Sequence, residues 1–423
     1  MTLRIAVLSM HTSPLAPLGG AVSGGMNVYV RELSRRMADR GYAVDVFTRR
    51  ERPDGPDIVE TEGGVRVVHI AAGPPVPVDK EALTGSIETF AMGVAAFARE
   101  HGMRYDLLHS HYWLSALAGD VLRGVWDAPH VVMFHTLGEA KNRARPTERE
   151  PLERIAGERL VARRADRIVV ATSHERELLT RRYGALSDRI TVVPCGVDLD
   201  LFRPVNKEDA RRQLGLADDE RIILFVGRIE PLKGIDILIS AAAQLHEEAD
   251  FFQAVIVGGD ARAETRVREL KSLATTLGVE HHVSFVGAVD HERLPLYYNA
   301  ADVCVVPSFY ESFGLVAVEA MACGTPVVAS RVGGLVTTVR DGETGYLVPW
   351  RCPEPFAERL DLLLRNDELR ASLGGAAREA VQRFRWSNVA DAVADIYAEL
   401  LDRPPRTFSV ASGGSPEGPG VVD

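Results

Sequence analysis

The sequence predicts an α/β protein built from two doubly wound, mostly parallel sheets with a cleft between them. Three observations support this fold class. Short apolar runs alternate with longer amphipathic segments, which is the pattern of successive βα units. The pattern starts again after residue 200. A chain of 423 residues is also too long for one hydrophobic core and suits two domains of ordinary size.

The first half opens with an apolar strand, a glycine-rich turn and a helix. These elements are predicted at residues 4–10, 19–25 and 26–40. Further short apolar runs predict strands at 43–48, 65–70, 106–111, 130–135, 167–172 and 190–193. Helical stretches lie between several of these strands, so residues 1–200 are predicted to form an N-terminal Rossmann-like domain.

The second half repeats this organisation. Strands are predicted at 222–226, 254–257, 283–286, 303–306, 327–329 and 346–348, which places a second Rossmann-like domain at 201–385. A last helix is predicted at 387–401, in a segment (386–402) that we expect to pack back on the first domain. The tail, 403–423, is rich in Pro, Gly and Ser and is predicted to be disordered. Because ligands of such sheets bind beyond the carboxyl ends of the strands, the two halves predict one deep inter-domain cleft.

Composition and charge exclude several classes of function. The net charge of -10 argues against nucleic-acid binding, which needs a basic face. The four cysteines contain no C-x-x-C pair, so neither a zinc site nor a disulfide framework is expected. We expect instead a reduced, cytoplasmic setting. The first residues run straight into a strand, so no signal peptide is expected. No apolar run reaches the roughly 18 residues that span a bilayer, although peripheral membrane contact stays open.

Two glutamates, Glu311 and Glu319, are the most informative feature of the chain. Glu311 lies in a turn after an apolar strand, and Glu319 lies about two turns into a helix that begins near Gly314. The N-terminus of that helix points at the predicted cleft. One carboxylate could bind the hydroxyls of a sugar and the other those of a ribose. The pair therefore predicts sugar transfer from an activated nucleotide.

Two cations follow the first strand of the second half. Arg228 and Lys233 stand in a strand-to-helix loop, which suits a diphosphate because their charges and the backbone N–H groups both favour anions. The alternative is a solvated loop, which the glutamate pair makes a poorer explanation. Gly333 and Gly334 follow another strand. They either let the backbone approach a phosphate or form a simple tight turn.

The first half carries its own polar residues at strand ends. The backbone of Gly24 and Gly25 could approach a phosphate or the reacting sugar. His109, His111 and His135 end two predicted strands, at the functional edge of the sheet. A metal on three histidines is not favoured without a carboxylate at ligand spacing, and histidines at strand ends also serve structural roles.

Two further motifs, for a metal site and for a dinucleotide site, are not favoured by the sequence. Asp198 and Asp200 form a D-x-D, which binds metal in some sugar transferases, but their place in the linker favours a turn and capping role. A dehydrogenase would need G-x-G-x-x-G directly after a strand with an acid about 20 residues later. That arrangement is not found in this sequence.

Taken together, the motifs resemble those of the retaining glycosyltransferases with the GT-B fold, in the large sucrose-synthase-like family 4. The resemblance extends to about residue 402 and includes the Pro-Cys-Gly-Val-Asp linker. It is strongest to the members that act in mycothiol synthesis, which transfer N-acetylglucosamine from UDP to 1D-myo-inositol 3-phosphate. The segments similar to those members begin at His11, Gly24, His109, His135 and Ser308.

The resemblance implies roles residue by residue. Arg228, Lys233, Glu311 and His135 would be catalytic. The implied donor-binding residues are Gly25, Arg228, Lys233, Val289, Glu311, Gly314, Leu315 and Glu319. The implied acceptor-binding residues, four of them for a phosphate, are His11, Asn27, Lys80, Tyr112, Thr136 and Arg154. No cofactor is required for catalysis, but a structural Mg²⁺ is implied at Tyr298, Asn299, Ala301 and Thr325, and so is a homodimer.

The acceptor side departs from the family pattern and leaves alternatives. Val22-Ser23 stands where the family has Asp-Ala, and Met133-Phe134 where it has small residues. Transfer to a sugar phosphate, as in sucrose-phosphate synthases, and mannosyl or glucosyl transfer to a lipid are the rival activities. A UDP-sugar sensor without turnover is the rival of another class. Since no carboxylate is obviously placed as a covalent nucleophile, we expect front-side, retaining transfer.

Overall fold

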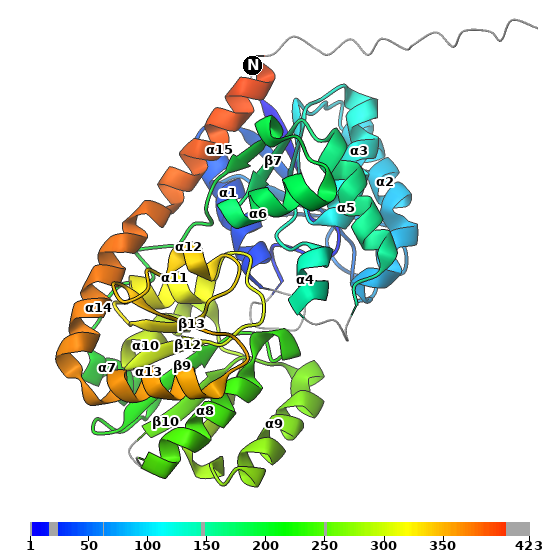
Figure 1. The fold of residues 1–423 in the computed structure, drawn as a ribbon. Helices are drawn as coiled ribbons and strands as arrows, with labels where there is room; N and C mark the ends of the chain where they lie inside the picture. The colour runs from blue at the N-terminus through cyan, green and yellow to red at the C-terminus, as the bar shows by residue number, and fades with distance from the viewer. Residues whose placement is uncertain (1, 17–23, 62, 145–148, 249–251, 403–423) are drawn as a thin grey trace, which may run out of the picture.

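The computed structural model describes residues 2–16, 24–61, 63–144, 149–248 and 252–402. Two α/β lobes, each with its own parallel sheet, stand one above the other (Figure 1). This confirms the predicted fold class. Most of the predicted glycine-rich turn and the whole predicted tail lie outside the described residues. Within the described ranges, no helix combines the length and apolar character needed to cross a bilayer.

The N-lobe contains an eight-stranded sheet in the order β3-β4-β2-β1-β5-β6-β7-β8. Neighbouring strands are parallel except β3 and β4, which are antiparallel. β3 was not predicted, because three residues at a sheet edge are too short to show periodicity. The strands are β1 (Arg4–Leu8), β2 (Ala43–Arg49), β3 (Ile58–Glu60), β4 (Arg66–Ile70), β5 (Leu107–His111), β6 (His130–Met133), β7 (Arg167–Val170) and β8 (Ile190–Val192).

Helices cover this sheet, and the longer ones bury one face against it. In α1, Tyr29, Val30, Leu33 and Met37 are buried, a spacing that places them on one helix face. The helices of this lobe are α1 (Gly25–Asp39), α2 (Ile87–Glu100), α3 (Trp113–Trp126), α4 (Gly138–Ala144), α5 (Leu152–Arg164) and α6 (Ser173–Leu178).

The C-lobe contains a six-stranded parallel sheet in the order β11-β10-β9-β12-β13-β14. Its strands are β9 (Arg221–Val226), β10 (Phe252–Val257), β11 (Val283–Gly287), β12 (Val303–Val306), β13 (Val327–Ser330) and β14 (Gly345–Val348). Its helices, with the C-terminal one, are α7 (Lys207–Leu214), α8 (Ile235–Glu248), α9 (Glu264–Thr276), α10 (Leu294–Ala300), α11 (Leu315–Ala322), α12 (Leu335–Thr338), α13 (Pro353–Arg365), α14 (Asp367–Ala380) and α15 (Trp386–Leu401).

The strand orders identify the binding edge of each lobe. Strand order reverses between β1 and β5 in the N-lobe and between β9 and β12 in the C-lobe. Ligands of doubly wound sheets bind outside the carboxyl ends of the strands at such switch points. The loops that follow these four strands are therefore the ones expected to carry the site.

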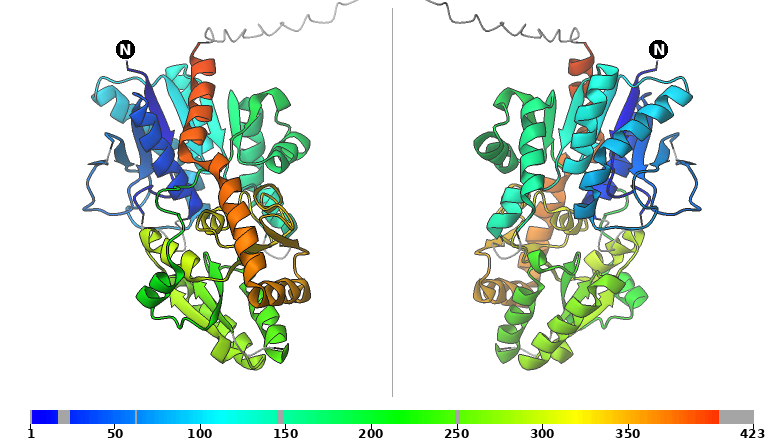
Figure 2. Two further views of the ribbon diagram at one scale, coloured as in Figure 1. Left: turned by 90° about the vertical axis from the view of Figure 1, so that its left-hand side faces the viewer. Right: turned by 90° about the vertical axis from the view of Figure 1, so that its right-hand side faces the viewer.

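The chain crosses between the lobes twice, and the crossings touch. The first crossing is the linker 193–206, and the second leads from α14 into α15, which climbs onto the N-lobe (Figure 2). The Val197 N–H donates to the Phe384 carbonyl at 2.8 Å. α15 then packs against α1, and the Tyr397 hydroxyl lies 2.6 Å from His109 Nδ1. The N-lobe therefore includes the last helix of the chain.

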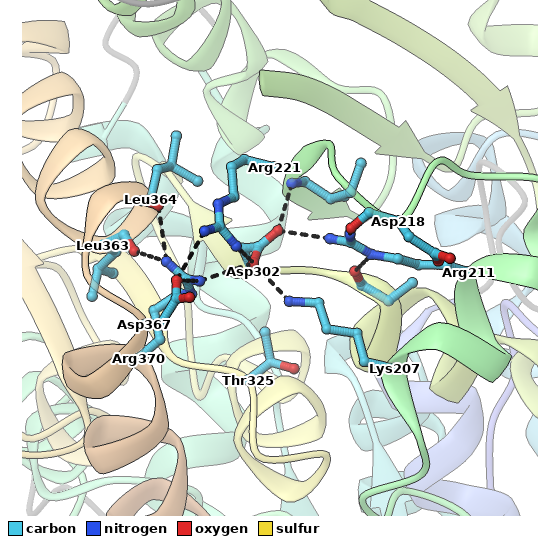
Figure 3. Close-up of polar contacts among 12 residues, drawn as sticks. Lys207, Arg211, Asp218, Arg221, Asp302, Thr325, Leu363, Leu364, Asp367 and Arg370 are labelled. Carbon is cyan, nitrogen blue, oxygen red and sulfur yellow. Dashed lines mark hydrogen bonds and ion pairs between the residues drawn. The ribbon is translucent and has the colours of Figure 1, made fainter. Parts of the chain in front are cut away.

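Asp302 organises the opposite end of the C-lobe sheet, just before β12. Figure 3 shows four cations around its buried carboxylate. They come from α7, β9 and α14, with nitrogen–oxygen distances of 2.6–3.5 Å: Lys207, Arg211, Arg221 and Arg370. Burial alone would raise the pKa of Asp302, but the Lys207 ammonium and the other cations outweigh it, so the pKa lies below its usual value. The carboxylate thus stays ionised and ties three elements together.

Candidate active site

The two lobes meet at the N-termini of α1 and α11. A Cβ added to Gly25 would lie 2.5 Å from Leu315 Cδ1 across the cleft, and one added to Gly24 would lie 3.9 Å from the Arg228 Nε. The lobes thus approach each other where both helices direct their N-terminal N–H groups toward the cleft, which favours an anion. A side chain at position 25 would therefore force the end of the Leu315 side chain to move.

Lys233 and Glu311 form the central ion pair of the C-lobe edge. The Lys233 Nζ lies 2.5 Å from Glu311 Oε1, and the Ser308 hydroxyl donates to the same oxygen at 3.1 Å. The loops after β9 and β12 are also joined by their backbones, since the Phe309 N–H donates to the Leu232 carbonyl at 2.8 Å. These contacts fix a cation and a carboxylate side by side at the strand ends.

The Gly333-Gly334 pair supports the Glu311 turn. The Gly334 N–H donates to the Glu311 carbonyl at 2.8 Å. A Cβ on Gly333 would lie 2.1 Å from the same carbonyl oxygen, and one on Gly334 would lie 2.2 Å from the Ser312 oxygen. The close backbone approach that these glycines allow is therefore to the turn that carries Glu311, which is a structural role.

Glu319 lies on α11 a little over one turn from its start, rather than the two turns predicted. The Tyr298 hydroxyl donates to Glu319 Oε2 at 2.7 Å, and His291 Nε2 lies 3.5 Å from Oε1, an ion-pair contact longer than an ordinary hydrogen bond. Burial lowers the pKa of His291, but its contact with Glu319 outweighs this, so the pKa lies above the usual value. Glu319, His291 and Leu315 line a cavity of about 240 Å³, together with α1, the linker and Trp386.

The remaining predicted donor residues lie around these groups. The Arg228 Nη2 pairs with Glu230 Oε1 at 2.9 Å. Gly314 immediately precedes α11 with φ 90°, a conformation that disfavours other residues. Val289 is partly buried and packs on the core that both lobes share.

His135 is held in place by His111 and Tyr29. The His135 Nε2 lies 2.9 Å from His111 Nδ1, and its ring centroid lies 5.3 Å from that of Tyr29. Burial lowers the pKa of His135 to about 3, so the ring is neutral at pH 7 and can take part in hydrogen bonds but not as a cation. In the described part of the chain, no group of three metal-binding side chains is found.

Arg154 is the centre of the predicted acceptor site. Its side chain is only 1% exposed and donates to Glu158 Oε1 at 2.7 Å, to Glu150 Oε2 at 2.7 Å and to the Thr136 hydroxyl at 3.0 Å. Its guanidinium also lies 5.0 Å from the Tyr112 ring centroid. Three of the predicted acceptor residues, Tyr112, Thr136 and Arg154, are thus in contact, and Arg154 is already paired with carboxylates.

The other predicted acceptor residues surround this cluster or support it. The His11 ring stacks at a tilt on Tyr112, with centroids 4.3 Å apart. The positive charge of Lys80 acts on both His11 and Glu150. Asn27 instead caps α1: its amide donates to the Thr12 hydroxyl at 2.7 Å, and its oxygen accepts the Gly24 N–H at 3.2 Å.

Sequence reasoning missed Glu150 as a site residue, and it placed His111 at the functional edge without giving it a role. A signal for Glu150 was present, because Glu150, Arg154 and Glu158 recur every four residues, a spacing that brings opposite charges together. His109 and His111 are two positions apart on β5, so their side chains face the same side of the sheet. Of the two departures from the family pattern, Met133 and Phe134 are buried in the cores, whereas Val22-Ser23 lies outside the described residues.

The four residues of the implied magnesium site have hydrogen-bond partners within the protein. The Thr325 hydroxyl donates to the Tyr298 carbonyl at 2.6 Å, and the Asn299 side-chain oxygen accepts the Val205 N–H at 2.8 Å. The donor set is all oxygen, as Mg²⁺ prefers, but it contains no carboxylate. Three of these oxygens are thus already engaged within the protein, and the metal stays a prediction. Separately, Asp198 accepts the Asp200 N–H at 3.0 Å, as expected for a turn.

Comparison with known proteins shows the family of the chain. Residues 23–201 match the family described as Glycosyltransferase Family 4, and residues 206–380 match Glycosyl transferases group 1. A D-inositol 3-phosphate glycosyltransferase of Xylanimonas cellulosilytica is 46% identical over 95% of this chain and 98% of its own. The chain belongs to the family 4 glycosyltransferases. It is therefore a glycosyltransferase.

Two further relatives extend the likeness. The D-inositol 3-phosphate glycosyltransferase of Corynebacterium diphtheriae is 44% identical, covering 95% of this chain and 96% of its own. Among solved structures, a sucrose-phosphate synthase from Thermosynechococcus elongatus superposes with a TM-score of 0.88 at 38% identity, over 94% of this chain and 99% of its own. This family 4 enzyme is therefore similar to relatives named for inositol 3-phosphate and to one named for sucrose phosphate.

Proposed function

We propose that this enzyme transfers N-acetylglucosamine from UDP to 1D-myo-inositol 3-phosphate with retention of configuration. The observation that carries the proposal is that each lobe gathers charged side chains, while the lobes approach each other between Gly25 and Leu315. The C-lobe presents Arg228, Lys233 and Glu311, and the N-lobe presents a cluster of cations around Arg154. The names of the most similar curated relatives supply the choice of acceptor.

In the proposed mechanism, positive charge assists departure of the diphosphate. Arg228 and Lys233 stabilise the negative charge that develops on the leaving oxygen. Glu311, already fixed by Lys233 and Ser308, binds hydroxyls of the donor sugar rather than attacking its anomeric carbon. Neutral His135 contacts the transferred sugar through hydrogen bonds. The leaving phosphate oxygen takes the acceptor's proton on the same face, and the apposed lobes limit access of water.

Product identification tests the proposal. The protein is incubated with UDP-N-acetylglucosamine and inositol 3-phosphate, and the product is characterised by mass spectrometry and by the anomeric proton coupling in NMR. We expect a glycosylated inositol phosphate with the α configuration of the donor. A β product would contradict retention, and no product with this pair but product with another would contradict the assignment.

A second candidate is transfer to a sugar phosphate, because the sucrose-phosphate synthase is 38% identical over nearly the whole chain. The same assay with UDP-glucose and fructose 6-phosphate tests this activity directly. Lipid acceptors, and binding of a UDP-sugar without turnover, are further arms of that panel. The homodimer stays a prediction that sedimentation would test.

A further inference from the structure

Three cations of the N-lobe, Lys80, Lys141 and Arg154, act on one carboxylate, that of Glu150. We call these three residues the cation pocket. Glu150 bridges two of them, since Oε1 pairs with the Lys141 ammonium and Oε2 accepts from Arg154 Nη1 at 2.7 Å. The charge of Lys80 acts on the same group. A carboxylate thus stands where positive charge from three separate segments converges.

Arg154 has two carboxylate partners that differ in how firmly they are built in. Glu158 lies on α5, is fully buried, and also accepts the Gly138 N–H at 3.0 Å. Glu150 precedes Pro151 and α5, so it belongs to a loop and not to the helix. Its own N–H donates to Asn142 Oδ1 at 2.7 Å. Glu158 is therefore a fixed structural partner, whereas Glu150 can leave without unwinding a helix.

The charge balance explains why a loop carboxylate occupies this place. A guanidinium as buried as Arg154 needs compensation for the water it has lost. The surrounding cations keep Glu150 ionised: burial would raise its pKa, but Arg154 and Lys141 outweigh this and lower it to about 2. Glu150 thus supplies the pocket with a permanent negative charge. A hollow of about 240 Å³ is lined nearby by Asn142, Arg143, Arg149 and Glu139.

We propose that Glu150 is an internal anion that occupies the cation pocket and yields it to the phosphate of the acceptor. Because the exchange replaces one anion by another, Arg154 never loses its compensating charge. A neutral acceptor offers no such replacement and leaves the Glu150 contacts in place. Glu150 therefore selects for phosphorylated acceptors by competing against the others. This inference rests on the proposed function only for the identity of the acceptor.

Inorganic phosphate is the probe that tests the exchange. Its dissociation constant is measured by calorimetry for the unchanged protein and for Glu150→Gln, which keeps the shape but loses the charge. We expect phosphate to bind about tenfold tighter to the variant, since charge-assisted contacts are roughly twice as strong as neutral ones. Glu150→Asp, whose shorter side chain cannot bridge Lys141 and Arg154, should show a smaller gain. Unchanged or weaker phosphate binding by both variants would overturn the proposal.

Two controls separate this result from a general charge effect and from misfolding. Glu139→Gln removes the same charge from neighbouring α4, where Glu139 pairs with exposed Arg159 at 2.5 Å, and should leave phosphate binding unchanged within about twofold. UDP affinity should be the same in all the variants, because the C-lobe edge is untouched. In turnover, Glu150→Gln should lower KM for the phosphorylated acceptor, in line with its tighter binding of phosphate. Since phosphate and UDP binding need no turnover, they remain decisive even if product identification names another acceptor.

Discussion

The two ends of the C-lobe sheet use charge in opposite ways. Before β12, one carboxylate, Asp302, is shared by four cations that tie helices and strands together. After β12, Glu311 is paired with one lysine, and the pair lies at the cleft. In the first arrangement the carboxylate itself is fully buried and is contacted by all four cations, of which Arg211 and Arg370 are also buried. The second leaves each group partly exposed, with capacity for further contacts. Charge serves stability at one end of the strand and chemistry at the other.

The largest loss of stability is expected from removing the buried charge of Asp302. Asp302→Asn removes the charge on which four cations converge, and loss of one partner of a buried ion pair costs about 3–5 kcal/mol. We expect the free energy of unfolding, measured by urea titration, to fall by that amount while kcat of the folded fraction is kept. Asp209→Asn, at an exposed pair with Arg212, should change it by less than about 0.5 kcal/mol. Equal effects of the two would contradict the comparison.

At the cleft end of the strand, Lys233→Ala should lower kcat strongly and change the stability little. Removing one cation that stabilises the leaving group should lower kcat by about 10²–10³, as for loss of one oxyanion donor. Stability should change by less than about 1 kcal/mol, because the remaining groups can be hydrated. Steady-state kinetics and urea titration check the two parts. Lys271→Ala, on α9 of the same lobe, is the control, and full activity of the Lys233 variant would refute its role.

The support of Glu311 can be broken without touching any charge. In Gly333→Ala the new Cβ would lie 2.1 Å from the Glu311 carbonyl oxygen, so the turn must move. A displacement of about 1 Å in a reacting group costs up to about 10² in kcat. Gly342→Ala shares the positive φ but meets nothing within 4 Å, which isolates backbone strain from displacement. Similar kcat values for both variants would mean that the glycine pair does not position Glu311.

The smallest effect concerns the pH dependence of donor binding. The pKa of His291 is raised in the folded protein by its contact with Glu319, so the ion pair is complete below about pH 6.5 and is lost as pH rises through the raised value. Above that pH, Glu319 Oε1 no longer pairs with a charged imidazole and can accept from a ribose hydroxyl. We expect KM for the donor to fall a few-fold (about twofold to fivefold) between pH 6 and 8, and His291→Gln to remove this trend. A trend that survives the substitution must have another origin.

The sequence predicted the site residues that directly follow apolar strands. It did not predict the important residues that lie elsewhere, such as Glu150 and Asp302. Lys233 and Glu311 were predicted to lie at the cleft because an apolar strand precedes each, and strand ends share an edge. The role of Gly333 stayed open, because a sequence does not reveal which backbone comes close. Glu150 was missed although its four-residue spacing from Arg154 is a signal, because it lies in the loop before α5, where that spacing alone does not predict a contact. Asp302 was missed because the cations around it come from segments about 70–95 residues apart in the chain.

The return of α15 to the N-lobe sets the smallest fragment that can fold. Residues 1–200 alone would leave the α1 side chains that face α15, and His109 without Tyr397, open to water. A truncated N-lobe must therefore retain residues 386–402. They can be supplied as a separate peptide or joined to the first half by circular permutation. The two crossings also touch each other, so we expect any change in the relative orientation of the lobes to be taken up where they meet.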